Sequence, residues 1–254
     1  PVLLSARPMP ALDTTKPMKL KDLIAASPMA CFSIFMLGGI FAAQFGMSAV
    51  YANRVGLTVG EISFFISSIY VSALVLQYPI GWISERMDRR SMIIWVSKLG
   101  GLGSLIAFLI PGYFILIVIS GAIVGGMSNP LYALIIAYAN DYLEKEDMAA
   151  ASGGLLFING LGAIAGPLIV GFMMDVIGDN GYWLFTALLM FAVGFYGLYR
   201  STQRSRTDIE TEYVPYTPVS AASTAIVAEV AQEAYIEAEA EIVEANEEAE
   251  QAGM

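Results

Sequence analysis

The sequence predicts an all-α membrane protein: a bundle of six transmembrane helices followed by an acidic tail that is either disordered or helical. Hydrophobic residues make up 57% of the 254 residues and charged residues only 14%, whereas about 25% of a soluble domain is charged. The mean hydropathy is +0.64. Apolar stretches recur at roughly the 20-residue length that lets a helix cross a hydrocarbon core. Their continuous apolarity favours helices over barrel strands, in which polar and apolar residues would alternate.

Six apolar runs, separated by short turn-forming segments, give the expected spans in order. We expect helices at about residues 30–52, 61–83, 91–110, 112–139, 148–175 and 181–200. The intervening segments are rich in Gly, Pro, Asn and charged residues, which interrupt apolar helices. Because these connections are short, consecutive helices should be antiparallel neighbours in one bundle. The bundle is therefore expected to occupy residues 30–200.

The two ends of the chain have a different composition from the bundle. Residues 1–29 are rich in proline and are predicted to be a cytoplasmic linker. Residues 201–254 form an acidic cytoplasmic tail in which Ala and Glu dominate from Ser220 onward. Such a composition is typical of a solvated helix or of disorder. The tail either solubilises the chain or docks onto a partner. Since the chain opens with Pro1 and shows no signal-peptide pattern, we expect it to be a fragment that lacks an N-terminal portion.

The distribution of basic residues predicts the orientation of the bundle. Eleven of the 13 Lys and Arg residues fall on one side of the expected spans, where they mark the cytoplasmic face. These are Arg7, Lys16, Lys19, Lys21, Arg86, Arg89, Arg90, Lys145, Arg200, Arg204 and Arg206. Arg54 falls on the other side, and Lys98 lies inside the third span, where it either faces an anionic cargo or extends to the membrane surface. Both termini should therefore be cytoplasmic.

The composition argues against several kinds of membrane enzyme. The chain has no histidine, so it lacks the commonest general base and metal ligand. The single cysteine, Cys31, cannot form an internal disulfide and is expected to pack as a small apolar residue. Carboxylates near the spans, such as Glu61 and Asp175, fall at helix ends, whereas an aspartyl protease or a proton relay needs acids within the membrane. We expect no enzyme activity, no metal, no cofactor and no nucleic-acid partner.

The turn between the second and third spans concentrates charge. It runs Gly-Trp-Ile-Ser-Glu-Arg-Met-Asp-Arg-Arg from Gly81 to Arg90. Glu85 and the arginines could build a charge network that joins helix ends and releases when the bundle moves. An ordinary cytoplasmic loop would need basic residues but no particular order. Charge alone does not separate these two interpretations.

The order of residues in this turn resembles the signature of major facilitator superfamily (MFS) transporters. Their second and third helices, and more weakly their eighth and ninth, are joined by Gly, three residues, an acid, Arg, any residue, Gly, Arg and a basic residue. The matching positions here are Gly81, Glu85, Arg86, Arg89 and Arg90. Asp88 replaces the second glycine, and a Glu stands where Asp is more frequent.

The fifth span carries a second resemblance to the same superfamily. Its stretch Gly160–Gly171 is similar to the glycine-rich fifth or eleventh helix of these transporters. Gly162 and Gly166 are four residues apart, so a neighbouring helix can approach closely, and Pro167 allows a bend. Simple helix packing would explain these residues equally well.

The resemblance covers about residues 25–200, and segments 77–81 and 125–133 are similar to the YcaD-like members. It implies the C-terminal six-helix half of a twelve-helix MFS transporter. The first, second, fourth and fifth spans would lie near the cavity, and the missing N-terminal six-helix half would meet Glu85. The arginine turn of that half would face three acids at the start of the fifth span. These acids are Glu144, Glu146 and Asp147.

Polar side chains inside the spans form stripes at helical spacing. They are Gln44, Ser48 and Tyr51; Ser63, Ser67, Tyr70 and Gln77; Asn129, Tyr132 and Asn140; and Asn159. Transporters of this kind bind their cargo near the middle of the membrane, so these residues are expected to line a cavity for a small-molecule substrate. Hydrogen bonds between helices are the alternative explanation and suit the serines better, whereas Gln44, Asn129 and Tyr132 favour the cavity.

The sequence thus predicts a secondary active transporter in the inner (plasma) membrane that works by alternating access. One alternative is a non-transporting membrane scaffold or sensor that acts through its acidic tail. Another is a six-helix half that dimerises.

Overall fold

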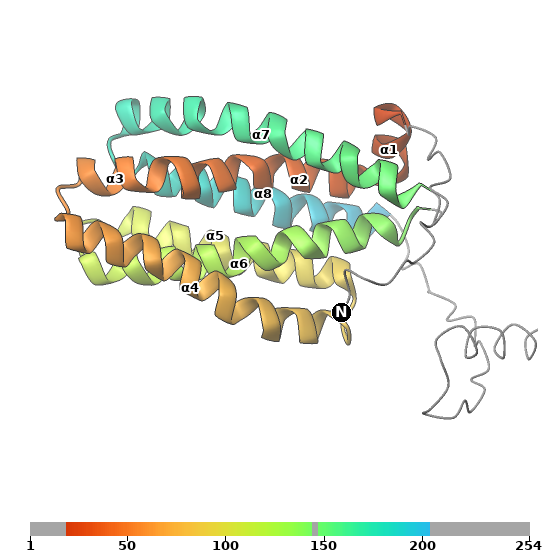
Figure 1. Cartoon of the computed structure of the whole chain (residues 1–254), viewed down its shortest axis with the longest axis horizontal. Coiled ribbons are helices and arrows are strands. Elements are labelled where there is room, and N and C mark those ends of the chain that lie inside the picture. The colour runs from red at the N-terminus through yellow and green to blue at the C-terminus, as the bar shows by residue number, and fades with distance from the viewer. Residues whose placement is uncertain (1–18, 144–146, 204–254) are drawn as a thin grey trace, which may run out of the picture. The chain divides into compact units, whose positions relative to one another are not determined.

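The computed structural model describes residues 19–143 and 147–203, which form helices and the turns between them. The first span combines three segments: α2 (Pro28–Phe41), the π-helix η2 (Ala42–Met47) and α3 (Ser48–Arg54). The other five spans are single helices (Figure 1). They are α4 (Val59–Ser84), α5 (Arg89–Leu109), α6 (Phe114–Asn140), α7 (Met148–Ile177) and α8 (Gly181–Gln203).

All six of these helical stretches are long and apolar enough to cross a membrane. The predicted all-α fold with six spans is therefore confirmed, and the predicted limits lie within three residues of the observed helix ends. The acidic tail lies outside the described residues from residue 204 onward, as do residues 1–18 of the predicted linker.

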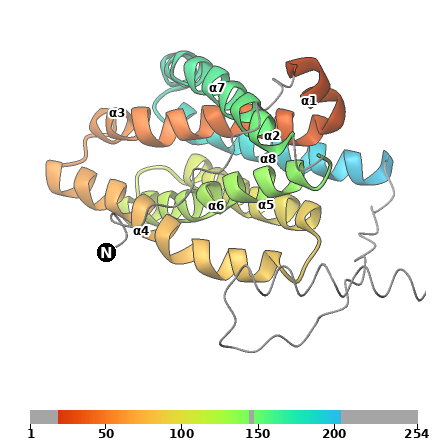
Figure 2. The same cartoon turned by 45° about the vertical axis from the view of Figure 1, so that its right-hand side comes forward.

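The last part of the predicted linker contains a short helix. Helix α1 (Leu20–Ala26) packs against the starts of α2 and α7 (Figure 1, Figure 2). Its anchor is Leu23, whose side chain is buried and lies close to Gly154. Pro28 then begins α2, because its fixed φ suits the first turn of a helix. An apolar side chain that reaches the bundle is thus enough to order this segment.

Local signals set the ends of the helices. Thr58 and Glu61 form a capping box at the start of α4, in which the Thr58 hydroxyl accepts from the Glu61 amide and the Glu61 carboxylate accepts from the Thr58 amide. Asp88 caps α5 by accepting from the Ser91 amide at 3.0 Å. Gly178 ends α7 with a φ of 100°, a conformation that favours glycine.

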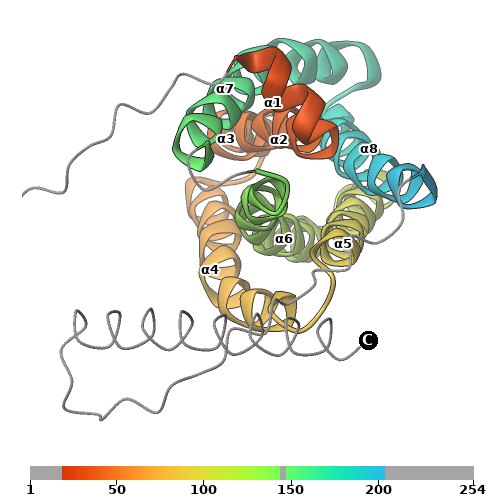
Figure 3. The same cartoon turned by 90° about the vertical axis from the view of Figure 1, so that its right-hand side faces the viewer.

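Helix α6 lies between α4, α5 and the first span. This helix contacts both α4 and α5, α5 also packs on α8, and the first span packs on α7 and α8 (Figure 3). Burial is uneven: 50–61% of the residues are buried in the most apolar windows of the first span, α5, α6 and α8, but only 17% in α4 and 28% in α7. Helices α4 and α7 therefore carry large apolar surfaces that the described part of the bundle does not cover.

The first span and α7 approach each other backbone to backbone. A Cβ atom on Gly162 would lie 2.0 Å from the carbonyl oxygen of Phe35, and one on Gly38 would lie 2.0 Å from that of Asn159. Only glycine fits at either position. Gly166 likewise lies against Gly39 of the first span. Small residues of this kind let membrane helices pack closely.

Candidate functional site

The middle of the first span departs from α-helical geometry at Gln44. This residue lies in the π-helix η2 and is only 3% exposed. Its Oε1 accepts a hydrogen bond from the Ser128 hydroxyl of α6 at 3.0 Å, while its Nε2 has no acceptor among the described residues. π-helical turns occur frequently at functional sites, and a buried donor without a partner is costly. Gln44 is therefore the strongest candidate for contact with a ligand.

Four aromatic rings from three helices lie on the exposed side of this segment. Phe41 and Phe45 of the first span have ring centroids 5.4 Å apart. Phe41 also contacts Tyr132 of α6 at 6.0 Å, and Phe45 stacks on Tyr70 of α4 at 5.6 Å. We call Phe41, Phe45, Tyr70 and Tyr132 the aromatic cluster. Phe45 is 48% exposed and Tyr70 is 52% exposed, so the cluster presents ring surface outside the bundle core.

The predicted polar residues separate into several groups. Gln44 bonds to Ser128 of α6, which Asn129 follows, while Tyr70 and Tyr132 contact the neighbouring rings of Phe45 and Phe41. Asn129 is half-buried, and its Nδ2 donates to the Gly125 carbonyl of its own helix at 3.2 Å.

Two predicted residues on the last part of the first span make structural contacts. Tyr51 is 2% exposed and stacks on Tyr182 at 4.8 Å in an aromatic core that also contains Phe65 and Trp183. Ser48 is buried, and its hydroxyl donates to the Gln44 carbonyl oxygen.

The remaining polar positions have helix-packing or surface roles. Asn159 joins α7 to the first span, because its Nδ2 donates to the Ile34 carbonyl at 3.0 Å. Ser63 is exposed and donates to Val59 of its own helix, and Ser67 is exposed. Asn140 is half-buried at the end of α6. Pro167 lies inside α7, which continues past it to Ile177.

A groove of about 380 Å³ lies between α4, α6 and the start of α5. Its lining includes Gln77 and three residues of the arginine turn, Gly81, Glu85 and Arg89. Glu85 is exposed and has no ion-pair partner within residues 19–143 and 147–203. This groove therefore carries an acid that is free to meet a positively charged or hydrogen-bond-donating group.

The three arginines of the turn make different contacts. Arg89 forms an ion pair with Asp141 at the end of α6 and donates to the Ala137 carbonyl, so it ties α5 to α6. Arg86 lies over the ring of Trp82 on α4, with its Cζ 3.9 Å from the ring centroid. Arg90 is nearly buried. Its Nη2 donates to the Tyr142 hydroxyl at 3.2 Å, and its guanidinium lies over the Tyr138 ring.

Asp88, which stands where the family signature has glycine, serves as the helix cap described above. Two of the three acids expected to face the absent half, Glu144 and Glu146, lie outside the described residues. The third, Asp147, is half-buried and directly precedes α7.

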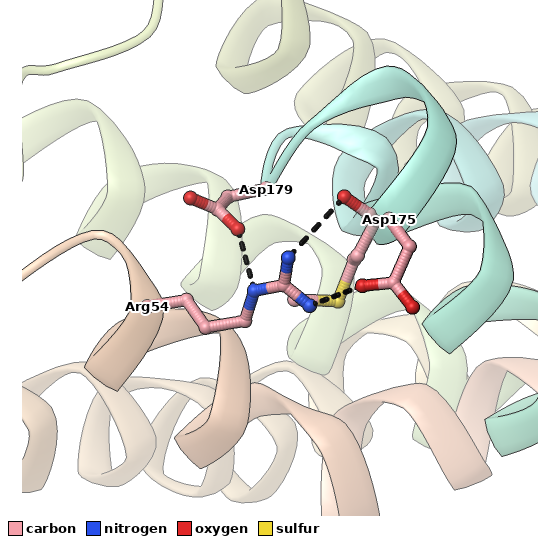
Figure 4. Close-up of polar contacts among 4 residues, drawn as sticks. Arg54, Asp175 and Asp179 are labelled. Carbon is pink, nitrogen blue, oxygen red and sulfur yellow. Dashed lines mark hydrogen bonds and ion pairs between the residues drawn. The ribbon is translucent and has the colours of Figure 1, made fainter.

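A second charged cluster lies at the opposite ends of the helices (Figure 4). Arg54 closes the first span. It donates from Nη1 to Asp175 of α7 at 2.8 Å and from Nε to Asp179, in the turn before α8, at 2.7 Å. We call Arg54, Asp175 and Asp179 the Arg54 clasp. It joins the end of the first span to the α7–α8 connection.

Two further predicted residues have ordinary surroundings. Lys98 is half-buried on α5, and its Nζ lies 5.8 Å from the ring centroid of Trp95, which is exposed. Cys31 is buried in the first span, and its thiol contacts the Leu23 carbonyl of α1.

Sequence reasoning missed Phe41, Phe45 and the clasp partners of Arg54. The i, i+4 spacing of the two phenylalanines around Gln44 was a signal that could have revealed one aromatic face. No local signal pairs Arg54 with aspartates that are 121 and 125 residues away.

Comparison with known proteins agrees with this architecture. The YfkF protein of Bacillus subtilis (strain 168), an uncharacterized MFS-type transporter, is 26% identical over 170 residues, which cover 65% of this chain and 42% of YfkF. The uncharacterized MFS-type transporter YcaD of Escherichia coli (strain K12 / DH10B) is 24% identical over 158 residues, 61% of this chain and 39% of YcaD. The aligned region thus spans about two fifths of the length of these relatives.

The model of the Major Facilitator Superfamily matches residues 29–232, which is most of the chain. The resemblance seen in the arginine turn and the glycine-rich helix, including the similarity to YcaD, is confirmed by these matches. The chain therefore belongs to the Major Facilitator Superfamily.

Proposed function

We propose that this chain is the C-terminal six-helix half of a secondary transporter that moves a small solute across the plasma membrane. The observation that carries the proposal is the combination on η2: a buried, unpaired amide donor on Gln44 and, from the next residue, a partly open surface of Phe45 and Tyr70. A transporter needs such a site near the middle of its spans, where discontinuous helices present polar groups to the cargo.

The uneven burial of the spans supports an alternating-access mechanism. Helices α4 and α7 are the least buried spans and are apolar along their length, so a second six-helix bundle could pack against them. Rocking of the two bundles would open the η2 region first to one side of the membrane and then to the other. Glu85, exposed beside the groove, would contact the other half in one of the two states.

The distribution of basic residues supports an orientation in which the arginine turn faces the cytoplasm and the Arg54 clasp faces outward. Cysteines can test it in a Cys31→Ala background. Val59 and Met87 are both exposed and lie at opposite ends of α4 and its turn. Val59→Cys should react with an impermeant maleimide in intact cells, and Met87→Cys only after permeabilisation. Labelling of Met87→Cys in intact cells would reject this orientation.

Uptake into membrane vesicles of both orientations, made with this chain joined to the N-terminal six-helix half, tests the transport function. A panel of labelled solutes should contain at least one whose accumulation requires the protein. Gln44→Ala and Asn129→Ala should lower that accumulation by about tenfold, the effect of losing one buried hydrogen bond to the cargo. Ser63→Ala is the matched control, because Ser63 is exposed and bonds only to its own helix. Unchanged uptake in both site variants would reject the proposed cavity.

Truncation separates transport from the alternative of a scaffold or sensor that acts through its tail. Residues 207–254 contain 12 acidic residues and no Lys or Arg, the composition that favours that alternative. A chain ending at residue 206 should keep its transport activity. Loss of all activity on truncation, with the membrane domain still folded, would favour the scaffold.

A further inference from the structure

We propose that the solute recognised at η2 is a planar aromatic molecule without a required charge, bound by stacking on the aromatic cluster. This inference rests on the proposed function, because it names the class of cargo that the same site would take. It starts from the rings, which the polar pattern of the spans did not reveal.

The first argument is the geometry of the rings. The Phe45 and Tyr70 rings are tilted by only 12° relative to each other, and the Phe41 and Phe45 rings by 24°. The Tyr132 ring is tilted by 41° relative to the Phe41 ring. Nearly parallel rings that are about half exposed leave open ring faces and edges, to which a further flat ring can add in an offset-stacked or edge-on arrangement.

The second argument is the distance of every described charged side chain on these helices from the cluster. Phe45 lies nine residues before Arg54, Tyr70 nine residues after Glu61, and Tyr132 nine residues before Asp141. At about 1.5 Å of rise per residue, each separation is roughly 13 Å along the helix. A charged cargo at the rings would thus have no counter-charge within contact distance on these three spans, and a buried unpaired charge is strongly disfavoured.

The third argument is the small number of polar groups at the site. The rings carry only the hydroxyls of Tyr70 and Tyr132, Gln44 Nε2 is buried beneath the surface, and Asn129 uses its own donor within α6. A sugar or polyol needs many directed hydrogen bonds, whereas a flat ring needs stacking and one acceptor. A ring bearing a single oxygen or nitrogen acceptor matches this set. The ring would meet Phe45 and Tyr70, the two exposed rings of the cluster.

Binding of two matched bicyclic alcohols tests the inference directly. 2-Naphthol is flat and aromatic, while trans-2-decalol has a similar size and the same hydroxyl group but no aromatic ring. Titration calorimetry on the full chain in lipid nanodiscs, with empty nanodiscs subtracted, measures both. We expect 2-naphthol to bind about tenfold more tightly, the scale of one good ring contact. Equal binding of the two alcohols would overturn the inference.

Substitutions in the aromatic cluster test whether 2-naphthol binds there. Phe45→Leu and Tyr70→Leu should each weaken 2-naphthol binding by about tenfold, whereas Phe45→Tyr and Tyr70→Phe keep a ring and should bind as the wild type does. Phe64→Leu is the matched control: Phe64 is exposed on α4 but contacts Phe114 away from the cluster. A melting temperature for each variant shows that it is folded. Unchanged 2-naphthol affinity in both folded Leu variants would overturn the inference.

The result of these binding experiments can be distinguished from the result of the transport experiment. Ring-dependent 2-naphthol binding without uptake of any solute would reject transport and keep the aromatic site. Uptake of only non-aromatic solutes, together with no ring-dependent binding, would reject the aromatic site and keep transport. If the rings serve only to pack against a second bundle, 2-naphthol binds no better than trans-2-decalol, and the inference fails.

Discussion

The two halves of the first span are held in the bundle by different kinds of contact. The α2 half touches α7 through backbone atoms, because glycines at 38 and 162 bring the two helices as close as atomic radii allow. The α3 half is held by side chains: the stacked ring of Tyr51 and the guanidinium of Arg54. The π-helix η2 separates the two halves.

This difference shows where the span can move. Two helices that pack backbone to backbone through glycine cannot shift slightly apart, since any separation opens a void along both helices. Ion pairs and stacked rings can break and re-form one at a time. We therefore expect α2 to stay fixed on α7 while α3 shifts about η2, which makes α3 the gating element of the proposed transporter.

The largest expected effect comes from filling the backbone contact. Gly162→Ala places a Cβ atom 2.0 Å from the Phe35 carbonyl oxygen, so the helices must separate, and we expect a loss of about 3 kcal/mol. Gly160→Ala is the control on the same helix, because its Cβ would meet nothing within 4 Å. Thermal unfolding in detergent measures both. Equal melting temperatures for the two variants would contradict the backbone contact.

A smaller loss should follow from removing the ring that holds α3. Tyr51→Leu deletes the stack on Tyr182 and the edge contact with Trp183, and we expect a loss of about 2 kcal/mol. Tyr51→Phe keeps the ring and should lose far less. The same thermal unfolding assay applies, and a loss as large as that in Gly162→Ala would remove the distinction between the two halves.

The Arg54 clasp should contribute less still. Arg54→Gln removes two ion pairs at the surface, where water screens the charges, so we expect only a small loss of stability. Asp179→Asn should cost more than Asp175→Asn, because the Asp179 side chain is 35% exposed and the Asp175 side chain 70%. In high salt, where exposed ion pairs are screened, the wild type should be no more stable than these variants. Salt-independent stability differences among these variants would count against an electrostatic clasp.

The smallest expected effect lies in η2 itself. A Cβ atom on Gly46 would meet nothing within 4 Å, so Gly46→Ala should change stability by no more than about 0.5 kcal/mol. Spin labels on α3 and α7 can then report whether α3 moves relative to α7. A large stability loss would show that the π-helix depends on glycine at this position, and that η2 is more constrained than we infer.

The spans were predictable because apolar length is a local property, and the arginine turn because its residues are consecutive. The assignment of Tyr51 to the face of Gln44 was less secure for a physical reason. It assumed 3.6 residues per turn throughout, whereas each π-helical turn holds an extra residue and rotates everything after it by about 100°. In the structure Tyr51 faces the aromatic core, while Gln44 meets α6.

The amino-acid sequence by itself determined that the chain forms six apolar helices of the Major Facilitator Superfamily, because length, composition and short motifs are written in neighbouring residues. Only the tertiary structure decided which faces meet. The Arg54 clasp, the aromatic cluster and the unpaired donor of Gln44 each depend on helices that are distant in the chain. Their pairing follows from how glycine surfaces and π-helical geometry let those helices pack.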